Sequence, residues 1–189
     1  MSATDTGAPT TGPILMELDP KAWETQLDRV EAWLNAVVTT QTAFRKLVED
    51  TLPGVEKPNL HLYLSEILDT ARRHEQAAGD LFRHIGRQPG TGRQAMGVLM
   101  GKAHEVVADL EGLAGGAAGP WRDLRQMVIA NMDAMGAFAV AEQLGLALGI
   151  HGLRDAAFPV VMEKSTQHLV LQELMLEMAS MAILYREKL

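Results

Sequence analysis

The chain has 189 residues, which is enough for one domain with a hydrophobic core, and its composition of 47% hydrophobic and 22% charged residues is typical of soluble globular proteins. It contains no cysteine, which excludes disulfides, thiolate metal sites and cysteine nucleophiles. The formal net charge of -7 argues against a general nucleic-acid-binding protein, because such proteins normally carry a basic surface.

Residues 1–18 are polar, with neither an early Lys or Arg nor an apolar central segment. They do not resemble a secretory signal, and we expect a disordered tail before a single domain at residues 19–189. The absence of a signal and of cysteine predicts a cytoplasmic protein. The most apolar stretch, residues 169–184, is interrupted by Glu173 and Glu177, which argues against a membrane span.

The first predicted helix begins at residue 20. Asp19 is suited to cap it, and Pro20 to occupy its first position, where a missing N–H costs nothing. The acidic residues Glu24, Asp28 and Glu31 share one face, which predicts a solvated stripe. Apolar residues recur at helical spacing on another face: Trp23, Leu27, Val30, Leu34, Val37, Val38, Phe44, Leu47 and Val48.

A segment rich in proline and glycine at residues 51–60 ends this helix. The second helix is predicted over residues 60–86, with Gly86 as its C-terminal cap. A shorter amphipathic helix follows at residues 95–113, and it ends in the flexible run AGGAAGP.

Pro120 opens a third predicted helix, which continues to residue 149. A short turn at residues 150–157 leads into a fourth helix from residue 158 to residue 188, with Pro159 in its first turn. Short loops within each pair of helices predict two antiparallel hairpins, and the long connection between the pairs contains the small helix. This pattern predicts an all-α fold, the ferritin-like four-helix bundle with one long crossover.

In such bundles metals are bound by inward-facing carboxylates and by Glu-x-x-His pairs, because residues three apart lie about 60° apart on a helix. No glutamate in this chain is followed three residues later by a histidine. Glu163 and His168 are five apart, a rotation of about 140°, so they cannot readily face the same ion. His74 can point into the bundle, although a single buried histidine is more often a hydrogen-bonded core residue than a metal ligand.

The stretch AMGAFAVAEQLGLALGIHGLRDAAFPVVMEKSTQHLVLQELM resembles the stress-response family of ferritin-like proteins, the YciE/YciF type. The stretches LFRHIGRQPG and AMGVLMGKAHEVV are similar to the second-helix end and the crossover helix of that family. The resemblance implies that Glu163 and His74 remain at ligand positions. It also implies that amides occupy former ligand positions at Gln41, Asn131 and Gln167.

One Glu and one His are too few for a di-iron centre, which needs several carboxylates to neutralise and bridge two cations. The resemblance therefore implies a non-enzymatic, stress-associated interaction or structural protein with a degenerate di-metal site and no cofactor. One alternative is a single Fe, Mn or Zn ion held by His74 and Glu163 with the help of the amides. The other is a small ligand in the bundle core, where Ala134, Gly136 and Ala137 leave room between helices.

The fourth helix carries more apolar residues than one buried stripe requires. We expect the excess to be covered either by a second copy of the chain, giving a homodimer through this helix, or by the crossover helix. Exposed methionine-rich patches also suit adaptable binding of a protein partner.

Overall fold

The computed structural model describes residues 19–90 and 119–185, and all of the regular structure in these ranges is helical. The predicted tail, the predicted crossover helix and the last residues predicted for the fourth helix lie outside the described residues. The long helices are α1 (Pro20–Thr51), α2 (Pro58–Asp80), α4 (Pro120–Ala147) and α5 (His151–Ser180). Short helical segments follow three of them: η1 (Leu52–Gly54), η2 (Leu81–Ile85) and the π-helical η3 (Met181–Tyr185).

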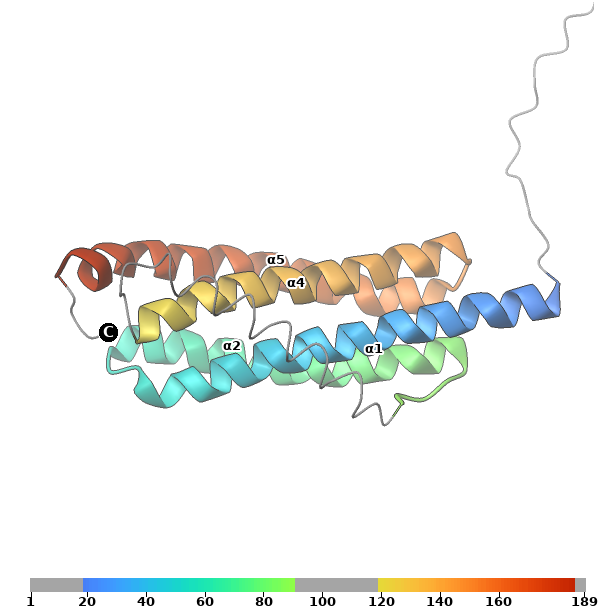
Figure 1. Cartoon of the computed structure of the whole chain (residues 1–189), viewed down its shortest axis with the longest axis horizontal. Coiled ribbons are helices and arrows are strands. Elements are labelled where there is room, and N and C mark those ends of the chain that lie inside the picture. The colour runs from blue at the N-terminus through green and yellow to red at the C-terminus, as the bar shows by residue number, and fades with distance from the viewer. Residues whose placement is uncertain (1–18, 91–118, 186–189) are drawn as a thin grey trace, which may run out of the picture.

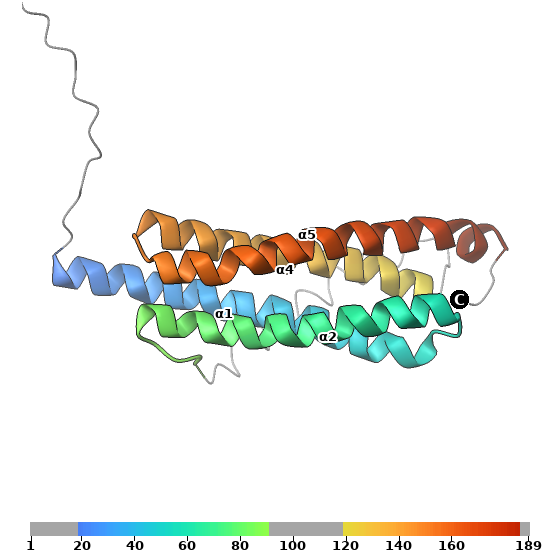
Figure 2. The same cartoon turned by 180° about the vertical axis from the view of Figure 1, so that it is seen from behind.

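The long helices form two antiparallel hairpins, α1 with α2 and α4 with α5, which lie side by side (Figures 1 and 2). Helix α1 packs against α2 and α4, and α5 packs against α4 and α2, so each helix has two neighbours. Helix α2 ends at one end of the bundle and α4 begins at the other (Figure 1). The predicted all-α bundle is confirmed. None of the described helices has the length and apolarity needed to cross a bilayer.

Local sequence signals place the starts of the first two helices. The Asp19 carboxylate accepts hydrogen bonds from the backbone N–H groups of Lys21 and Ala22 at 2.9 and 3.0 Å, and Pro20 occupies the first turn. Both predictions are confirmed. Helix α2 likewise has a proline, Pro58, in its first turn and begins two residues earlier than predicted.

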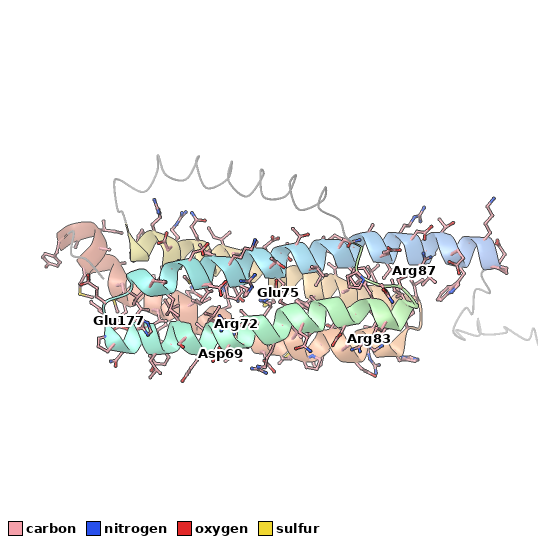
Figure 3. All side chains as sticks on the ribbon, turned by 90° about the horizontal axis from the view of Figure 1, so that it is seen from below. Asp69, Arg72, Glu75, Arg83, Arg87 and Glu177 are labelled. Atoms are coloured by element: carbon pink, nitrogen blue, oxygen red, sulfur yellow. The ribbon has the colours of Figure 1, made fainter. Side chains whose placement is uncertain are left out.

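Ion pairs stabilise the end of the first hairpin. Gly86 takes up the left-handed conformation and terminates η2, which confirms its predicted role as a cap. The next residue, Arg87, lies beside α1 (Figure 3) and places its Nη2 2.9 Å from Glu24 and 3.0 Å from Asp28. Its Nη1 lies 3.5 Å from Glu31. The acidic residues of α1, which were predicted to form only a solvated face, therefore bind Arg87 and hold the segment after η2 against α1.

The fourth helix begins at His151 and not at residue 158, which corrects the sequence prediction. Pro159 therefore lies inside the helix and not in its first turn. The turn between α4 and α5 shortens to residues 148–150, with Ile150 N–H bonded to the carbonyl oxygen of Gly145 at 2.8 Å. Buried Leu153 and Ala157 explain the early start, because their packing stabilises turns that lack strong local helix signals.

Gly145 allows this tight turn. A Cβ at this position would lie 2.8 Å from the backbone nitrogen of Arg154 and 3.1 Å from the carbonyl oxygen of Ile150. Because both neighbours are backbone atoms, they cannot swing aside as the end of a side chain can. The absence of a side chain at Gly145 is therefore what lets α5 fold back directly onto α4.

The apolar core is divided along the bundle into two clusters. One lies at the end with the α4–α5 turn, and the other lies at the end with the α1–α2 turn. The first includes Leu34, Phe82 and Phe138, and the second includes Phe44, Leu64 and Leu124.

Polar side chains are buried between the two clusters. On α5, Val160 belongs to one cluster and Leu171 to the other, and the buried Lys164 lies between them. Every long helix contributes at least one such residue, and α1 also buries Thr39 and Thr40, whose hydroxyl groups donate to carbonyl oxygens of the same helix. We take one residue from each helix and call these four the central polar layer: Gln41 from α1, His74 from α2, Asn131 from α4 and Lys164 from α5.

Two tryptophans join neighbouring helices. Trp33 Nε1 donates a hydrogen bond to the carbonyl oxygen of Ala137 at 2.9 Å and so links α1 to α4. Trp121 Nε1 donates to the carbonyl oxygen of Met175 at 2.9 Å and links α4 to α5. Trp33 packs against the cluster at the α4–α5 turn, whereas Trp121 belongs to the other cluster.

Candidate functional site

The central polar layer brings together three of the residues predicted from the sequence, namely Gln41, His74 and Asn131. Gln41 and Asn131 are fully buried, and His74 is 3% exposed. Each lies on the inward face of its helix, in the same rotational phase as the apolar core residues. The fourth member, Lys164, was not among the predicted residues.

Lys164 is a buried amine with few partners. Its Nζ donates a hydrogen bond to Asn131 Oδ1 at 3.2 Å and lies 4.4 Å from the centroid of the Phe44 ring. Asn131 Nδ2 in turn donates to the carbonyl oxygen of Lys164 at 3.0 Å. Burial lowers the pKa of Lys164 to about 7, because the charged form loses its hydration and gains only one acceptor and one aromatic face.

His74 and Glu163 meet across the α2–α5 interface, with His74 Nε2 3.0 Å from Glu163 Oε2. Glu163 also lies 3.6 Å from Arg73 Nη2, and its side chain is 48% exposed, so it sits at the rim of the layer and faces α2. Burial lowers the pKa of His74, and the positive charges of Lys164 and Arg73 act in the same direction, whereas Glu163 opposes them. The neutral imidazole is therefore the favoured form.

Gln41 holds the first hairpin together, since its Nε2 donates to the carbonyl oxygen of Ala71 at 2.9 Å. Its Oε1 and the Nδ1 of His74 are buried and have no hydrogen-bond partner among the described residues. Gln167 is only half-buried and lies outside the layer, and its Oε1 is also without a partner there.

Two further residues near the layer, Glu75 and His168, are not members of it, and the buried Nδ1 of His168 has no hydrogen-bond partner among the described residues. Glu75 faces α1 (Figure 3), where its two carboxylate oxygens accept hydrogen bonds from Thr42 and Arg45, each at 2.7 Å. His168 is not a partner of Glu163, as their spacing of five residues predicts. No three His, Asp or Glu side chains within residues 19–90 and 119–185 are grouped so that they could hold a metal ion.

The layer therefore offers one imidazole in the interior and one carboxylate at the rim, and these two bind each other. A lysine occupies the same layer, and its positive charge reaches His74. Chemically this is a hydrogen-bonded, cationic or neutral centre, and not an anionic one.

The small residues of α4 that were expected to leave room for a ligand in the bundle core do not all face the core. Ala134 and Ala137 are buried, but Gly136 lies on the exposed face of the helix, with open space around the position of a Cβ. Gly136 therefore does not widen the core, which corrects that part of the expectation.

Metal-ligand spacing does not single out Lys164, because a lysine is not a usual metal ligand. The signal that identifies it is its phase, since it follows the buried Val160 by four residues and precedes the buried Leu171 by seven. A lysine in the apolar phase of an amphipathic helix is predicted to be buried, whatever its chemistry.

No model of a known protein family matches the chain, and no curated protein or solved structure is significantly similar to it. The resemblance noted in the sequence thus remains an expectation. The geometry of the bundle is the ground on which a function can be assigned.

Proposed function

We propose that this chain is a ferritin-like bundle without a redox metal centre, acting as a non-enzymatic interaction or structural protein. The observation that supports this most directly is Lys164, a buried amine in the layer to which all four long helices contribute. A di-metal centre needs several carboxylates there, and Lys164 supplies none. Its protonated form, which dominates below pH 7, also opposes the entry of cations.

The arrangement of the helices is compatible with the ferritin-like part of this proposal. Two antiparallel hairpins joined between opposite ends of the bundle are the arrangement that ferritin-like folds share (Figure 1). The association with stress comes from the sequence resemblance alone.

The alternative is a single Fe, Mn or Zn ion, and the contact between His74 and Glu163 favours it over other positions. Elemental analysis of protein purified without a nickel column separates the two readings. We expect far less than one equivalent of metal. One equivalent of iron, manganese or zinc that is lost in Glu163→Ala but kept in Glu177→Ala, an exposed position on the same helix, would establish the alternative.

We propose that the outer face of α5 is the protein-binding surface. Exposed apolar side chains recur there every seven residues at Met162, Leu169 and Leu176, and Ile183 continues the pattern into η3. We call these four residues the outer stripe. A repeat of seven is what a helix needs to pack lengthwise against another helix. We propose that a second copy of the chain covers the outer stripe.

If the outer stripe is the dimer interface, a charge introduced into it is expected to prevent dimerisation. Leu169→Glu buries an unpaired carboxylate in the interface, so sedimentation equilibrium is expected to show a dimer for the native chain and a monomer for this variant. Leu62→Glu on α2 is the control, because Leu62 is 57% exposed and Leu169 is 66% exposed. A monomeric native chain, or a dimer that tolerates Leu169→Glu, would count against the proposal.

A further inference from the structure

We propose that the two copies pair with their α5 helices parallel, about a two-fold axis that runs along the bundle, so that Leu169 meets Leu169 and Leu176 meets Leu176. This inference rests on the homodimer proposed above. It follows from the different charges on the two edges of the outer stripe.

The edge of the outer stripe that faces α2 carries three carboxylates of α5. Two cations lie beside it, Arg73 at 3.6 Å from Glu163 and Lys57, whose Nζ lies 3.3 Å from Met181 Sδ, so this edge keeps a net negative charge. Glu163 marks this edge through its contacts with His74 and Arg73 of α2. Glu177 follows Glu163 by fourteen residues, two full repeats of seven, and so lies on the same edge. Glu173 is exposed between this edge and the stripe. From residue 155 to residue 185, the one Lys or Arg is Lys164, which is buried.

The other edge faces α4 and carries a positive charge. The Ser165 Oγ contacts the Met135 Sδ at 3.3 Å, which places the two helices in contact along this edge. On α4, Met132 is exposed, and Arg125 precedes it by seven residues and so shares its face. No ion pair joins Arg125 to any residue that the structure describes.

The register between the antiparallel helices puts Arg125 level with the middle of the outer stripe. Asn131 is bonded to Lys164, and Trp121 is bonded to Met175. Arg125 lies between Trp121 and Asn131 along α4, so it is level with the part of α5 between Leu169 and Leu176.

Symmetry then decides the orientation. When two identical helices pack face to face in antiparallel fashion, each edge meets its own copy, which would set the carboxylates of the α2-facing edge against the same edge of the partner. When they pack in parallel, opposite edges meet, and Arg125 of one copy faces Glu173 and Glu177 of the other. Like charges across an interface oppose association and unlike charges favour it, so the parallel pairing is preferred.

Cysteine cross-linking tests the orientation cleanly because the chain contains no cysteine of its own. We expect Leu169→Cys and Leu176→Cys, each as a single variant, to form disulfide-linked dimers under mild oxidation. Leu62→Cys on α2 is the control and is expected to remain uncross-linked. Positions seven residues apart are separated by about 10 Å along a helix, and a disulfide requires Cα atoms within about 7 Å. An antiparallel pair can therefore bring only one of the two positions to its two-fold axis.

The outcomes separate this inference from the proposed dimer. If one variant alone cross-links, or if cross-links form only when the two variants are mixed, the dimer stands and the parallel orientation is wrong. If neither the variants nor their mixture cross-link, the outer stripe is not the interface, and both proposals fail.

A second experiment tests the orientation by removing two carboxylates and measuring the dissociation constant of the dimer. The double variant Glu173→Gln, Glu177→Gln is expected to weaken the parallel dimer, raising its dissociation constant about three- to tenfold at low salt. In an antiparallel dimer the same variant would strengthen association, because it would remove repulsion between the two acidic edges. A lower dissociation constant in the ultracentrifuge would thus overturn the parallel arrangement.

Discussion

At the residue scale, Lys164 makes the interior of the bundle sensitive to pH. Burial lowers its pKa from 10.5 to about 7. Between these two values the unfolded chain binds a proton at this residue and the folded chain does not. Stability therefore rises with pH from about 7 towards 10, by at most about 1.4 kcal/mol per pH unit from this residue.

We predict that Lys164→Met removes this pH dependence. The variant is expected to be more stable than the native chain at pH 7, by about 1–4 kcal/mol, because an apolar side chain of similar length carries no charge to desolvate. Urea unfolding at pH 7, 8 and 9 measures both effects, and Lys46→Met, at an exposed position, is expected to keep the native slope. A Lys164→Met protein with an unchanged slope would show that Lys164 does not titrate in this range.

The candidate site was predictable only in part at this scale. Spacing rules relate residues on one helix, so they correctly separate Glu163 from His168, but they cannot place Glu163 beside His74 on another helix. The resemblance to a family pointed to both residues. The hydrogen bond between them and the pairing of Asn131 with Lys164 depend on how four helices come together, which no single segment encodes.

At the element scale, the start of α1 could be predicted from the sequence because capping is local: Asp19 and Pro20 act within one turn of helix. The start of α2 was predicted two residues too late, because Pro58 was assigned to the break before the helix and no side chain caps its first turn. The start of α5 could not be read in this way. Proline at position 159 suggested a first turn, but packing of Leu153 and Ala157 extends the helix backwards past it, to a turn that needs close contact with Gly145.

Gly145→Ala tests that contact. The added methyl group would meet the backbone of Arg154 and Ile150, so we expect a loss of about 1–3 kcal/mol in the free energy of unfolding. Gly136→Ala, on the same helix, is the matched control. Its methyl group would enter open space, and the higher helix propensity of alanine is expected to leave stability unchanged or to raise it by up to about 1 kcal/mol. Equal effects at the two positions would contradict the close approach at Gly145.

At the scale of the whole molecule, the all-α bundle was predictable because helical periodicity and short loops within each pair of helices leave few other arrangements. The division of the core was not predicted. The central polar layer separates two apolar clusters, yet α1, α2, α4 and α5 each pass through both of them. Continuous helices couple the two halves, so we expect them to unfold together in one cooperative step.

The tryptophans provide a way to see this, since Trp33 and Trp121 lie at opposite halves of the core. With Trp23 also replaced by Phe, a chain that keeps only Trp33 emits light from one half, and a chain that keeps only Trp121 emits from the other. We expect the two fluorescence curves in urea to coincide, because each long helix crosses the central polar layer and one half cannot unfold without breaking all four helices. If they separate, the layer is a seam at which the molecule opens first.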